Sequence, residues 1–404
     1  MLIDQYAGSS VMGMEIRPFA MAREWAKGGD DVTLVLGSFS HLRRKNPDVT
    51  CGISTWTEEG VRFCVLPTPV YQRNDIRRAI NVIVFIRQLN QAARTLANRY
   101  APNVVVASST HPFDFGPARR IAAFAKATVV FELHDLWPLS PIELYHFSPF
   151  HPLMRLIDKS ERHAFSKADA VVSVLPCADR FLAEQHITPR RYLHIPNGSF
   201  GCAPTPPPQS HCETLRLMRQ RFGFLVLYAG GFSAANAVAD FIALAHRMPH
   251  IAFAAVGDGP EKAYLTPLAH ENHNLCLLDS VTPGALATLL SQADVLWPGT
   301  RDLTIYRYGL AMNKLFDYML AARPVLLAVH CDDTPISSSG CGITVPPGDI
   351  EAMCAALQSL RALSLSDRDA MGMCGRRYVL RRHSYPLLAA QFKILLEELS
   401  HAPI

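Results

Sequence analysis

Short runs of apolar, mostly β-branched residues alternate with longer helical stretches along this chain of 404 residues, and this alternation constrains the fold more than any other feature. Near-continuous apolar runs are typical of parallel strands that are covered on both faces. Their alternation with helices is typical of βαβ units, so the first half is expected to form a doubly wound α/β domain. The expected strands span 2–7, 32–36, 104–107, 128–131 and 170–174, and the expected helices span 18–27, 76–100, 117–125 and 153–165.

A proline-rich segment at 202–210, with the composition of a linker, interrupts the pattern before it resumes. We therefore expect an α/β fold of two Rossmann-like domains, 1–200 and 201–384, facing each other across a cleft at the carboxyl ends of their strands. The segment 385–404 is expected to form a helix that opens near Pro386 and packs back on the N-terminal domain. The expected strands of the second half span 224–229, 251–256, 275–278, 295–297 and 325–329.

The composition excludes several classes of protein. A hydrophobic fraction of 49% and a charged fraction of 18% indicate a globular chain, and a net charge of +4 is small for a nucleic-acid binder. The ten cysteines form no C-x-x-C pair and no signal-peptide pattern precedes them, so we expect reduced thiols in a cytoplasmic protein and no metal site. No apolar window reaches the about 18 residues of a membrane-spanning helix.

Several nucleotide and catalytic motifs are absent from the sequence. There is no G-x-G-x-x-G after the opening strand, no G-x-x-x-x-G-K-[ST] and no G-x-S-x-G. The D-x-D pattern of metal-dependent sugar transferases occurs only at 367–369, where we interpret it as surface charge on a late helix. We therefore expect neither a bound cofactor nor a catalytic metal.

The segment 293–325 carries the clearest chemistry. It predicts a strand, a polar loop and a helix that begins near Met312 and stops before Pro324. A helix N-terminus offers unpaired N–H groups and a positive dipole end to a diphosphate. Lys314 could neutralise phosphate charge there, and Asp317, one turn into the helix, could accept hydrogen bonds from ribose hydroxyls. On spacing alone, a surface helix turn explains the pattern equally well.

The same segment resembles the donor-binding segment of glycosyltransferase family 4, the retaining glycosyltransferases of the GT-B fold. It is especially similar to a branch from bacterial exopolysaccharide and O-antigen pathways that is related to N-acetylfucosamine transferases. Asp317 stands where the family has its ribose-binding glutamate, and Gly309 stands where the family has an earlier glutamate that contacts the sugar. The matching positions are 301–303, 306–309, 313–319 and 323–325.

The resemblance extends over almost the whole chain. It includes the glycine-containing loop at 6–18, the stretch 131–143, the turn 195–198, the loop 228–236 and the turn 256–262. By this resemblance, the donor-binding candidates are Gly13, Gly230, Gly231, Asn236, Gly257, Asp258, Gly259, Tyr308, Gly309, Leu310, Asn313 and Asp317.

The loop 232–236 departs from the family pattern because it lacks the arginine and lysine that bind the diphosphate in many members. We nominate Lys314 and Arg301 as substitutes. His134 corresponds to the histidine that ends an N-domain strand and faces the sugar. These three residues are the catalytic candidates, with a purely structural histidine as the alternative for His134.

Four further residues are candidates for the acceptor side: Glu15, Arg17, His111 and Asp135. Each also has a structural alternative. Glu15 and Arg17 could pair with each other, Asp135 could cap the following turn, and His111 could be a satisfied histidine after its strand.

A group of basic residues in the first half lies among apolar ones at 80 and 82–86. Such a surface could dock on anionic lipid headgroups, which suits a lipid-linked acceptor, whereas the alternative is a solvated helix with one buried face. No nucleic-acid partner is expected, because aromatic residues are not interleaved. The basic residues are Arg43, Arg44, Lys45, Arg73, Arg77, Arg78, Arg87 and Arg94.

The resemblance implies a retaining glycosyltransferase without a metal. It would move a sugar from a nucleoside diphosphate sugar, UDP-linked, to a lipid-linked or saccharide acceptor during the synthesis of bacterial surface polysaccharide. The protein would be cytoplasmic, with peripheral contact to the inner membrane as an option. A nucleotide-sugar epimerase of the same architecture and a degenerate transferase that acts as a scaffold are the alternatives.

Overall fold

The computed structural model describes residues 1–13, 16–49, 51–72, 76–199, 201, 203–331 and 333–400. Two compact units divide the chain. Unit 1 comprises Met1–Asn197 and the C-terminal segment that begins at Tyr385, and unit 2 comprises Gly198–Ser384.

Unit 1 contains a sheet with the strand order β3-β4-β2-β1-β5-β6-β7-β8, in which only the β3–β4 pair is antiparallel. Its strands are β1 (Leu2–Ile3), β2 (Thr33–Gly37), β3 (Ser54–Glu58), β4 (Val61–Leu66), β5 (Val104–Ala107), β6 (Thr128–Leu133), β7 (Ala170–Ser173) and β8 (Tyr192–His194). Its helices are α1 (Ile16–Lys27), α2 (Ile76–Tyr100), the 3-10 helix η1 (Pro112–Asp114), α3 (Phe115–Ala125), α4 (Leu139–Tyr145), α5 (Pro152–Lys167), α6 (Ala178–Glu184) and α15 (Tyr385–Ser400).

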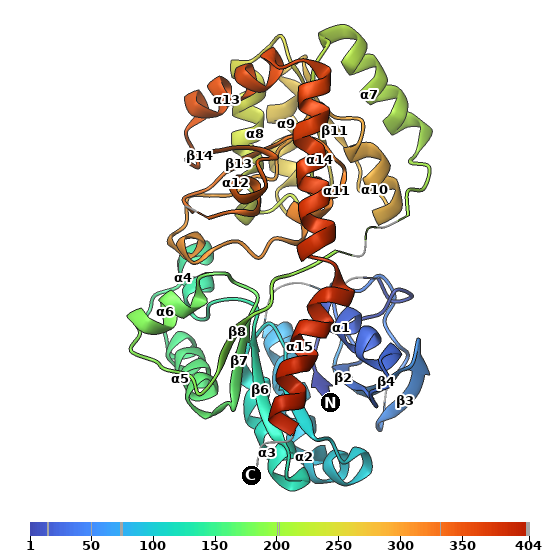
Figure 1. Ribbon diagram of the computed structural model, residues 1–404, viewed down its shortest axis with the longest axis vertical. Coiled ribbons are helices and arrows are strands. Elements are labelled where there is room, and N and C mark those ends of the chain that lie inside the picture. The colour runs from blue at the N-terminus through green and yellow to red at the C-terminus, as the bar shows by residue number, and fades with distance from the viewer. Residues whose placement is uncertain are drawn as a thin grey trace. The chain divides into compact units, whose positions relative to one another are not determined.

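Helices cover both faces of this sheet. On one face, α1 and α15 pack together over the strands (Figure 1), and the Trp25 indole nitrogen donates a hydrogen bond of 2.9 Å to the Ala389 carbonyl. On the other face, α3 packs against α2 and α5, and the rings of Phe131 in β6 and Phe165 in α5 lie 5.5 Å apart. The C-terminal helix is therefore part of unit 1.

In helix α2 the buried positions recur every four residues, which places them on one face of the helix. Phe85, Leu89 and Ala93 are buried, whereas most of the residues between them are partly or fully exposed. Asn81 continues the buried stripe because both ends of its amide are satisfied: it accepts from Gln5 Nε2 at 2.6 Å and donates to the Pro69 carbonyl at 2.7 Å. The helix is thus held to the sheet by one stripe only.

Unit 2 contains a parallel sheet with the strand order β11-β10-β9-β12-β13-β14. Its strands are β9 (Leu225–Ala229), β10 (Ala252–Val256), β11 (Leu275–Leu278), β12 (Val295–Leu296), β13 (Val325–Ala328) and β14 (Gly342–Val345). Its helices are α7 (Gln209–Phe222), η2 (Ala234–Asn236), α8 (Val238–Arg247), α9 (Lys262–His270), α10 (Pro283–Leu290), η3 (Thr304–Tyr308), α11 (Asn313–Leu320), α12 (Pro335–Ser339), α13 (Ile350–Ala362) and α14 (Leu365–Arg382).

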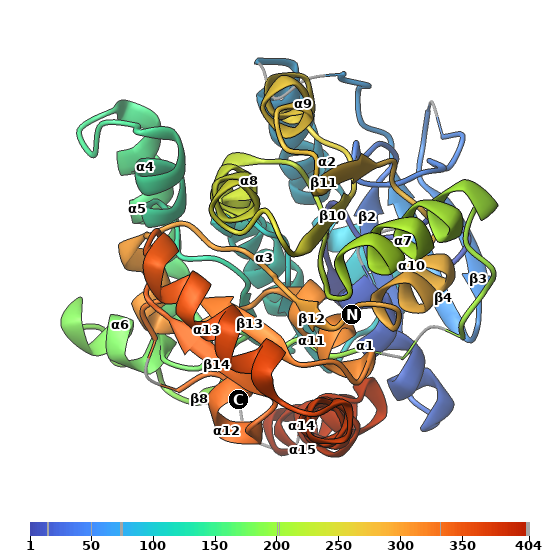
Figure 2. The ribbon, with the colours of Figure 1, turned by 90° about the horizontal axis from the view of Figure 1, so that it is seen from above.

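Two apolar clusters flank this second sheet. One cluster joins the sheet to α8, α9 and α13, and the other joins it to α7, α10, α11, α12 and α14. Figure 2 shows α8 and α13 on one side of the strands and α7 and α10 on the other. Both units are therefore doubly wound, which confirms the predicted α/β class with parallel sheets.

The structure differs from the sequence expectation at several elements. The first strand ends at Ile3 rather than at residue 7, because the Asp4 carboxylate accepts hydrogen bonds from the Tyr6 and Ala7 amides and turns the chain. Strands β3, β4, β8 and β14 were not expected. The side chains of β3 are intermediate or exposed, as befits an edge strand, so it lacks the apolar run that marks the buried strands. The linker expected at 202–210 ends earlier, since α7 begins at Gln209.

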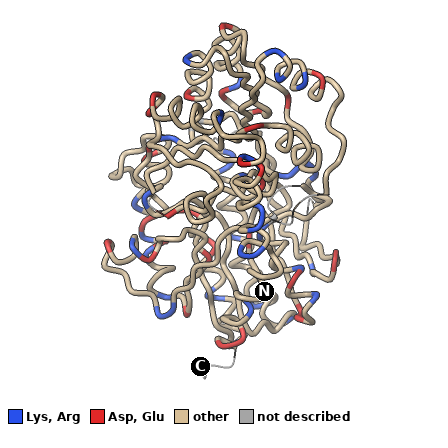
Figure 3. Tube along the Cα trace, turned by 45° about the horizontal axis from the view of Figure 1, so that its top comes forward, with Lys and Arg blue, Asp and Glu red and all other residues tan. Residues whose placement is uncertain are grey.

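Two properties of the described chain bear on its possible partners. Among the described residues, no helix is long and apolar enough to cross a membrane. Figure 3 shows positive and negative residues interspersed along the Cα trace.

Candidate functional site

At the carboxyl ends of the strands in unit 2, two loops and the start of one helix lie close together. Gly230 and Gly231 follow β9, and Gly257, Asp258 and Gly259 follow β10. The Phe232 amide donates to the Asp258 carbonyl at 2.9 Å, so the two loops are tied together by backbone. Ligands of open α/β sheets bind at this edge.

Glycine is required where these two loops touch. A β-carbon on Gly257 would collide with the Gly230 carbonyl oxygen, and one on Gly259 would collide with the Phe232 backbone. The loops therefore form a backbone surface without side chains, as a close approach to a nucleotide requires.

Helix α11 begins at Asn313 beside these loops. Its N-cap residue, Met312, makes no side-chain capping bond. The Lys314 ammonium donates a hydrogen bond of 2.6 Å to Asn236 Oδ1 and lies 5.0 Å from the centre of the Tyr228 ring. Burial lowers the pKa of Lys314 from its ordinary value to about 7. The structure thus brings a lysine of α11 to the loop 232–236, which has no basic residue of its own.

One turn further along α11, Asp317 faces solvent and accepts a hydrogen bond of 3.0 Å from Ser199 Oγ. Although part of the Asp317 side chain reaches solvent, the protein atoms around its carboxylate desolvate it and raise its pKa, and the Ser199 hydrogen bond partly offsets this. Asn313, at the first position of the helix, is exposed. Tyr318 points the other way, into the core, where its hydroxyl donates to the Ala229 carbonyl at 2.7 Å and fixes α11 against β9. The exposed face of α11 therefore carries the predicted polar side chains.

The remaining candidates of the segment 293–325 differ in how exposed their side chains are. Arg301 is exposed in the loop after β12, and its charge acts on Asp240 at the start of α8 rather than on α11. Tyr308 and Leu310 are buried, so their side chains pack inside the unit and leave only their backbone for a ligand. Gly309 lies between them and has a φ of 100°, a conformation that favours glycine.

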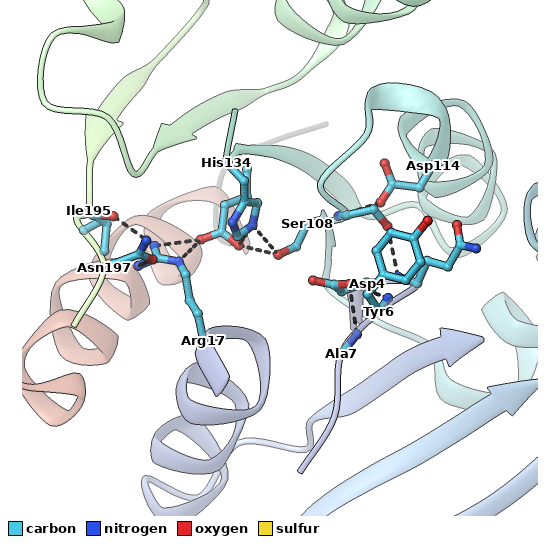
Figure 4. A network of polar contacts seen from close by, with 12 residues as sticks. Asp4, Tyr6, Ala7, Arg17, Ser108, Asp114, His134, Ile195 and Asn197 are labelled. Atoms are coloured by element: carbon cyan, nitrogen blue, oxygen red, sulfur yellow. Dashed lines mark hydrogen bonds and ion pairs between the residues drawn. The ribbon is translucent and has the colours of Figure 1, made fainter. Parts of the chain in front are cut away.

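In unit 1, His134 follows β6 and is part of a buried polar network (Figure 4). Its Nε2 lies 3.4 Å from Glu132 Oε2 and 3.1 Å from Ser108 Oγ, and Ser108 donates to the same carboxylate at 2.5 Å. Burial alone would lower the pKa of His134, but the hydrogen bond and charge of Glu132 outweigh it, so the pKa is raised. The ring is therefore held in one orientation and favours its protonated form.

Arg17, expected on the acceptor side, is instead buried in an ion pair. Its guanidinium donates to Glu132 Oε1 at 2.8 Å and to the Ile195 carbonyl at 2.9 Å, and it also contacts Asn197 (Figure 4). Burial would raise the pKa of Glu132, but Arg17, His134 and Ser108 together hold it well below its ordinary value. Arg17 thus joins α1 to β6 and to the turn 195–198, so it cannot also contact an acceptor.

The structure places the remaining candidates of unit 1 in different environments. His111 is buried, and its Nε2 lies 2.7 Å from Gln5 Oε1; burial lowers the pKa of His111 to about 4. Asp135 is exposed directly after His134. Gly13 lies in the loop after β1 with a φ of 64°. Glu15 lies outside the described residues, so its possible pairing with Arg17 stays a prediction; among the described residues, Arg17 pairs with Glu132.

Three residues of this network were not singled out in the sequence: Glu132, Ser108 and Asp114. Asp114 accepts from the Ser109 amide at 3.0 Å, and burial raises its pKa to about 6. The available signal was a carboxylate in the middle of an apolar strand run, at 128–133, since buried carboxylates are rare unless they are paired. Within the described parts of the chain, no three His, Cys, Asp or Glu side chains are arranged to hold a metal ion, and the nine described cysteines are free thiols.

We compared the chain with known protein families and with curated proteins. Residues 12–198 match the family model described as a glycosyl transferase 4-like domain. A search of curated proteins gave no match.

Solved structures cover essentially the whole chain. Sucrose-phosphate synthase from Thermosynechococcus elongatus is 16% identical, with a TM-score of 0.76 and 98% of each chain covered. Alr3699/HepE of Anabaena, in complex with UDP and glucose, is 15% identical, with a TM-score of 0.64 and 98% of each chain covered. WaaG, a glycosyltransferase involved in lipopolysaccharide biosynthesis, is 15% identical, with a TM-score of 0.63 and 100% of each chain covered.

These two findings define the fold of the chain. Residues 12–198 are similar to the glycosyl transferase 4-like domain, and the whole chain has the GT-B fold of the solved glycosyltransferases.

Proposed function

We propose that this protein transfers a hexose-type sugar from a UDP-linked donor, with retention of anomeric configuration, to a lipid-linked or saccharide acceptor in bacterial surface polysaccharide synthesis. The observation that carries this proposal is the Lys314 ammonium at 2.6 Å from Asn236, beside the glycine loops of unit 2. The same fold in HepE was solved with UDP and glucose, and WaaG is involved in lipopolysaccharide biosynthesis. The branch similar to N-acetylfucosamine transferases stays part of this proposal.

In the proposed reaction, negative charge develops on the leaving diphosphate. Lys314 and the uncapped N-terminus of α11 stabilise that charge by electrostatics, which is commonly the largest catalytic contribution. Asp317 accepts hydrogen bonds from the ribose hydroxyls, and the loops after β9 and β10 lie along the nucleotide. The nucleotide sugar is the only co-substrate in this scheme, and no resident cofactor is assigned.

We assign orientation of the sugar to His134. Glu132 and Ser108 hold its ring in place, and the Glu132 carboxylate raises the pKa of His134, so the protonated ring is stabilised relative to an ordinary histidine. The acceptor hydroxyl transfers its proton to the leaving phosphate, so the scheme assigns no dedicated protein base. We place the protein in the cytoplasm, with peripheral contact to the inner membrane.

A thermal-shift screen with UDP, GDP and dTDP sugars tests the proposal directly. Binding of a ligand to the folded state raises the unfolding temperature by mass action. We expect a rise with UDP and with at least one UDP-sugar. No shift with any donor would reject the transferase and favour a scaffold. An epimerised sugar nucleotide formed without acceptor would reject it in favour of an epimerase.

The assignment of Asp317 to the ribose predicts a change in nucleotide preference. Wild-type protein is expected to bind UDP about tenfold or more tightly than 2′,3′-dideoxy-UDP, since a hydrogen bond to a charged group contributes about 1.5–3 kcal/mol. The Asp317→Ala variant is expected to bind both nucleotides alike. Isothermal titration calorimetry measures both affinities, with Glu213→Ala, which removes an exposed carboxylate of unit 2 paired with Arg216, as the matched control. A preference that survives in Asp317→Ala would refute the assignment.

A further inference from the structure

A large apolar groove lies within unit 1, apart from the polar network around His134. Its volume is about 1170 Å³, above the usual about 300–1,000 Å³ of small-molecule pockets. Helix α2 forms one wall and α5 the other, while η1 and the start of α3 form the floor and α4 contributes its end. The apolar lining includes Val82, Ile83, Ile86, Phe113, Phe115, Pro141, Tyr145, Leu153, Leu156 and Ile157.

The walls are apolar where solvent would favour polar residues. Ile83 on α2 is 63% exposed and Leu156 on α5 is 53% exposed, and both line the groove. On the floor, a β-carbon placed on Gly116 would meet no atom within 4 Å. The groove is therefore open, continuous and wide enough at its base for a hydrocarbon chain, and contiguous apolar surface of this kind marks a binding site.

The charges around the groove have one sign. Arg78 and Arg87 on α2 and Lys159 on α5 line it, and no aspartate or glutamate is among the described residues that do so. On α5, the neighbouring Asp158 is engaged by Arg162 at 3.0 Å. Apolar walls with only cationic charges are complementary to an amphiphile whose polar end is anionic.

One end of the groove leads to the His134 network. Tyr6 and His111 line that end, with their rings 6.1 Å apart. His111 Nε2 lies 2.7 Å from the side-chain oxygen of Gln5, and the backbone N–H of Gln5 donates to Ser109 Oγ at 3.0 Å; Ser109 follows Ser108 in the chain. A chain lying in the groove with its head at Tyr6 would therefore point that head toward the residues that surround His134.

Only some of the basic residues noted in the sequence line the groove. Arg43 is buried and donates to the Ala7 carbonyl at 2.7 Å and to the Gly37 carbonyl at 2.8 Å, so it supports the loop after β1. Arg73 lies outside the described residues. Arg78 and Arg87 are the members of that group that line the groove, so the structure replaces a broad basic patch by a defined groove.

We propose that this groove binds the hydrocarbon chain of a lipid phosphate or diphosphate, which rests on the proposed function in that this lipid carries the sugar acceptor. The chain lies between α2 and α5 on the floor of α3. Arg78, 5.6 Å from the centre of the Tyr6 ring, holds the phosphate groups at that end, and the saccharide end extends toward His134. Arg87 and Lys159 add positive charge along the groove.

Calorimetric titration with farnesyl diphosphate, in excess UDP so that the diphosphate site of unit 2 is filled, tests this proposal. We expect the wild-type protein to bind farnesyl diphosphate at least about tenfold more tightly than inorganic pyrophosphate, because only the former buries a chain. Leu156→Glu and Gly116→Leu are each expected to weaken farnesyl diphosphate binding at least about tenfold. Gly116 lies in helix α3, where leucine is a better helix former, so this variant is expected to fold.

Leu217→Glu is the matched control, since Leu217 is 52% exposed on α7 of unit 2 and lies outside the groove. It should leave farnesyl diphosphate binding unchanged. Equal binding of farnesyl diphosphate and pyrophosphate, or tight binding that both groove variants retain, would overturn the proposal. So would binding to vesicles of phosphatidylglycerol and phosphatidylethanolamine that Leu156→Glu abolishes while farnesyl diphosphate does not bind, since the face would then be a membrane-docking surface.

The proposal for the groove and the proposal for the donor site can be refuted independently. UDP binding to unit 2 should be the same in Leu156→Glu, Gly116→Leu and wild type. Wild-type protein that binds farnesyl diphosphate in the groove but binds no nucleotide would support the groove and reject the proposed function.

Discussion

Replacing Lys314 with alanine is expected to weaken UDP binding by about tenfold to a hundredfold, because one hydrogen bond to a charged group contributes about 1.5–3 kcal/mol. Lys314 lies between the glycine loops and the start of α11, and it is the basic residue that contacts the loop 232–236. Isothermal titration calorimetry with UDP measures the effect. Arg216→Ala removes an exposed positive charge of unit 2, paired with Glu213, and should change the affinity little.

The pH dependence of UDP affinity distinguishes a direct electrostatic role of Lys314 from a role in packing. The pKa of Lys314 is lowered to about 7, and a bound diphosphate would raise it. UDP affinity is therefore expected to fall as the pH rises above this pKa, because the ammonium must regain a proton to bind the anion. Lys314→Arg should bind UDP with no such fall. A Lys314→Ala affinity within about twofold of wild type, or an unchanged pH profile in Lys314→Arg, would contradict the assignment.

Replacing Arg17 with methionine is expected to lower the free energy of unfolding of unit 1 by about 3–5 kcal/mol. The substitution leaves the buried Glu132 carboxylate without its main counter-charge, and breaking a buried ion pair on one side has this cost. Urea denaturation followed by circular dichroism measures it. Arg190→Met removes one side of an exposed pair with Asp169 and should cost at most about 1 kcal/mol.

A double variant tests the physical reason. Arg17→Met combined with Glu132→Leu removes both charges, so it is expected to be more stable than Arg17→Met alone. If Arg17 contacted an acceptor instead, the single variant would keep wild-type stability and lose only activity. That result would restore the acceptor-side prediction for Arg17.

The sequence predicted the elements better than it predicted their partners. Helix α2 and the strands β5 and β11 have the bounds expected from the apolar pattern, since that pattern is a local property of each segment. The edge strand β3 was missed because its half-exposed side chains carry no such pattern. The prediction that Lys314 and Asp317 lie at the start of a helix also rested on a local pattern, and the structure confirms it.

The candidate site was less predictable than the fold. Asn236 was singled out through the family resemblance, but its contact with Lys314 joins residues 78 positions apart. Arg17 was predicted on the acceptor side, with pairing to Glu15 as the alternative, and its observed partner Glu132 lies 115 positions away. The burial of Tyr308 and Leu310 likewise depends on how their loop folds over the unit.

The sequence by itself determined two α/β units, the helix that presents Lys314 and Asp317, and the resemblance that gives the class, because hydrophobic period and local motifs are written in consecutive residues. Only the tertiary structure decided that Lys314 reaches the loop lacking its own basic residue, that Glu132 holds both Arg17 and His134, and that α2, α3 and α5 enclose an apolar groove. The physical reason is that these contacts depend on strand order. A parallel sheet brings together side chains from segments that are far apart in the chain, and nothing in their local pattern specifies which segments meet.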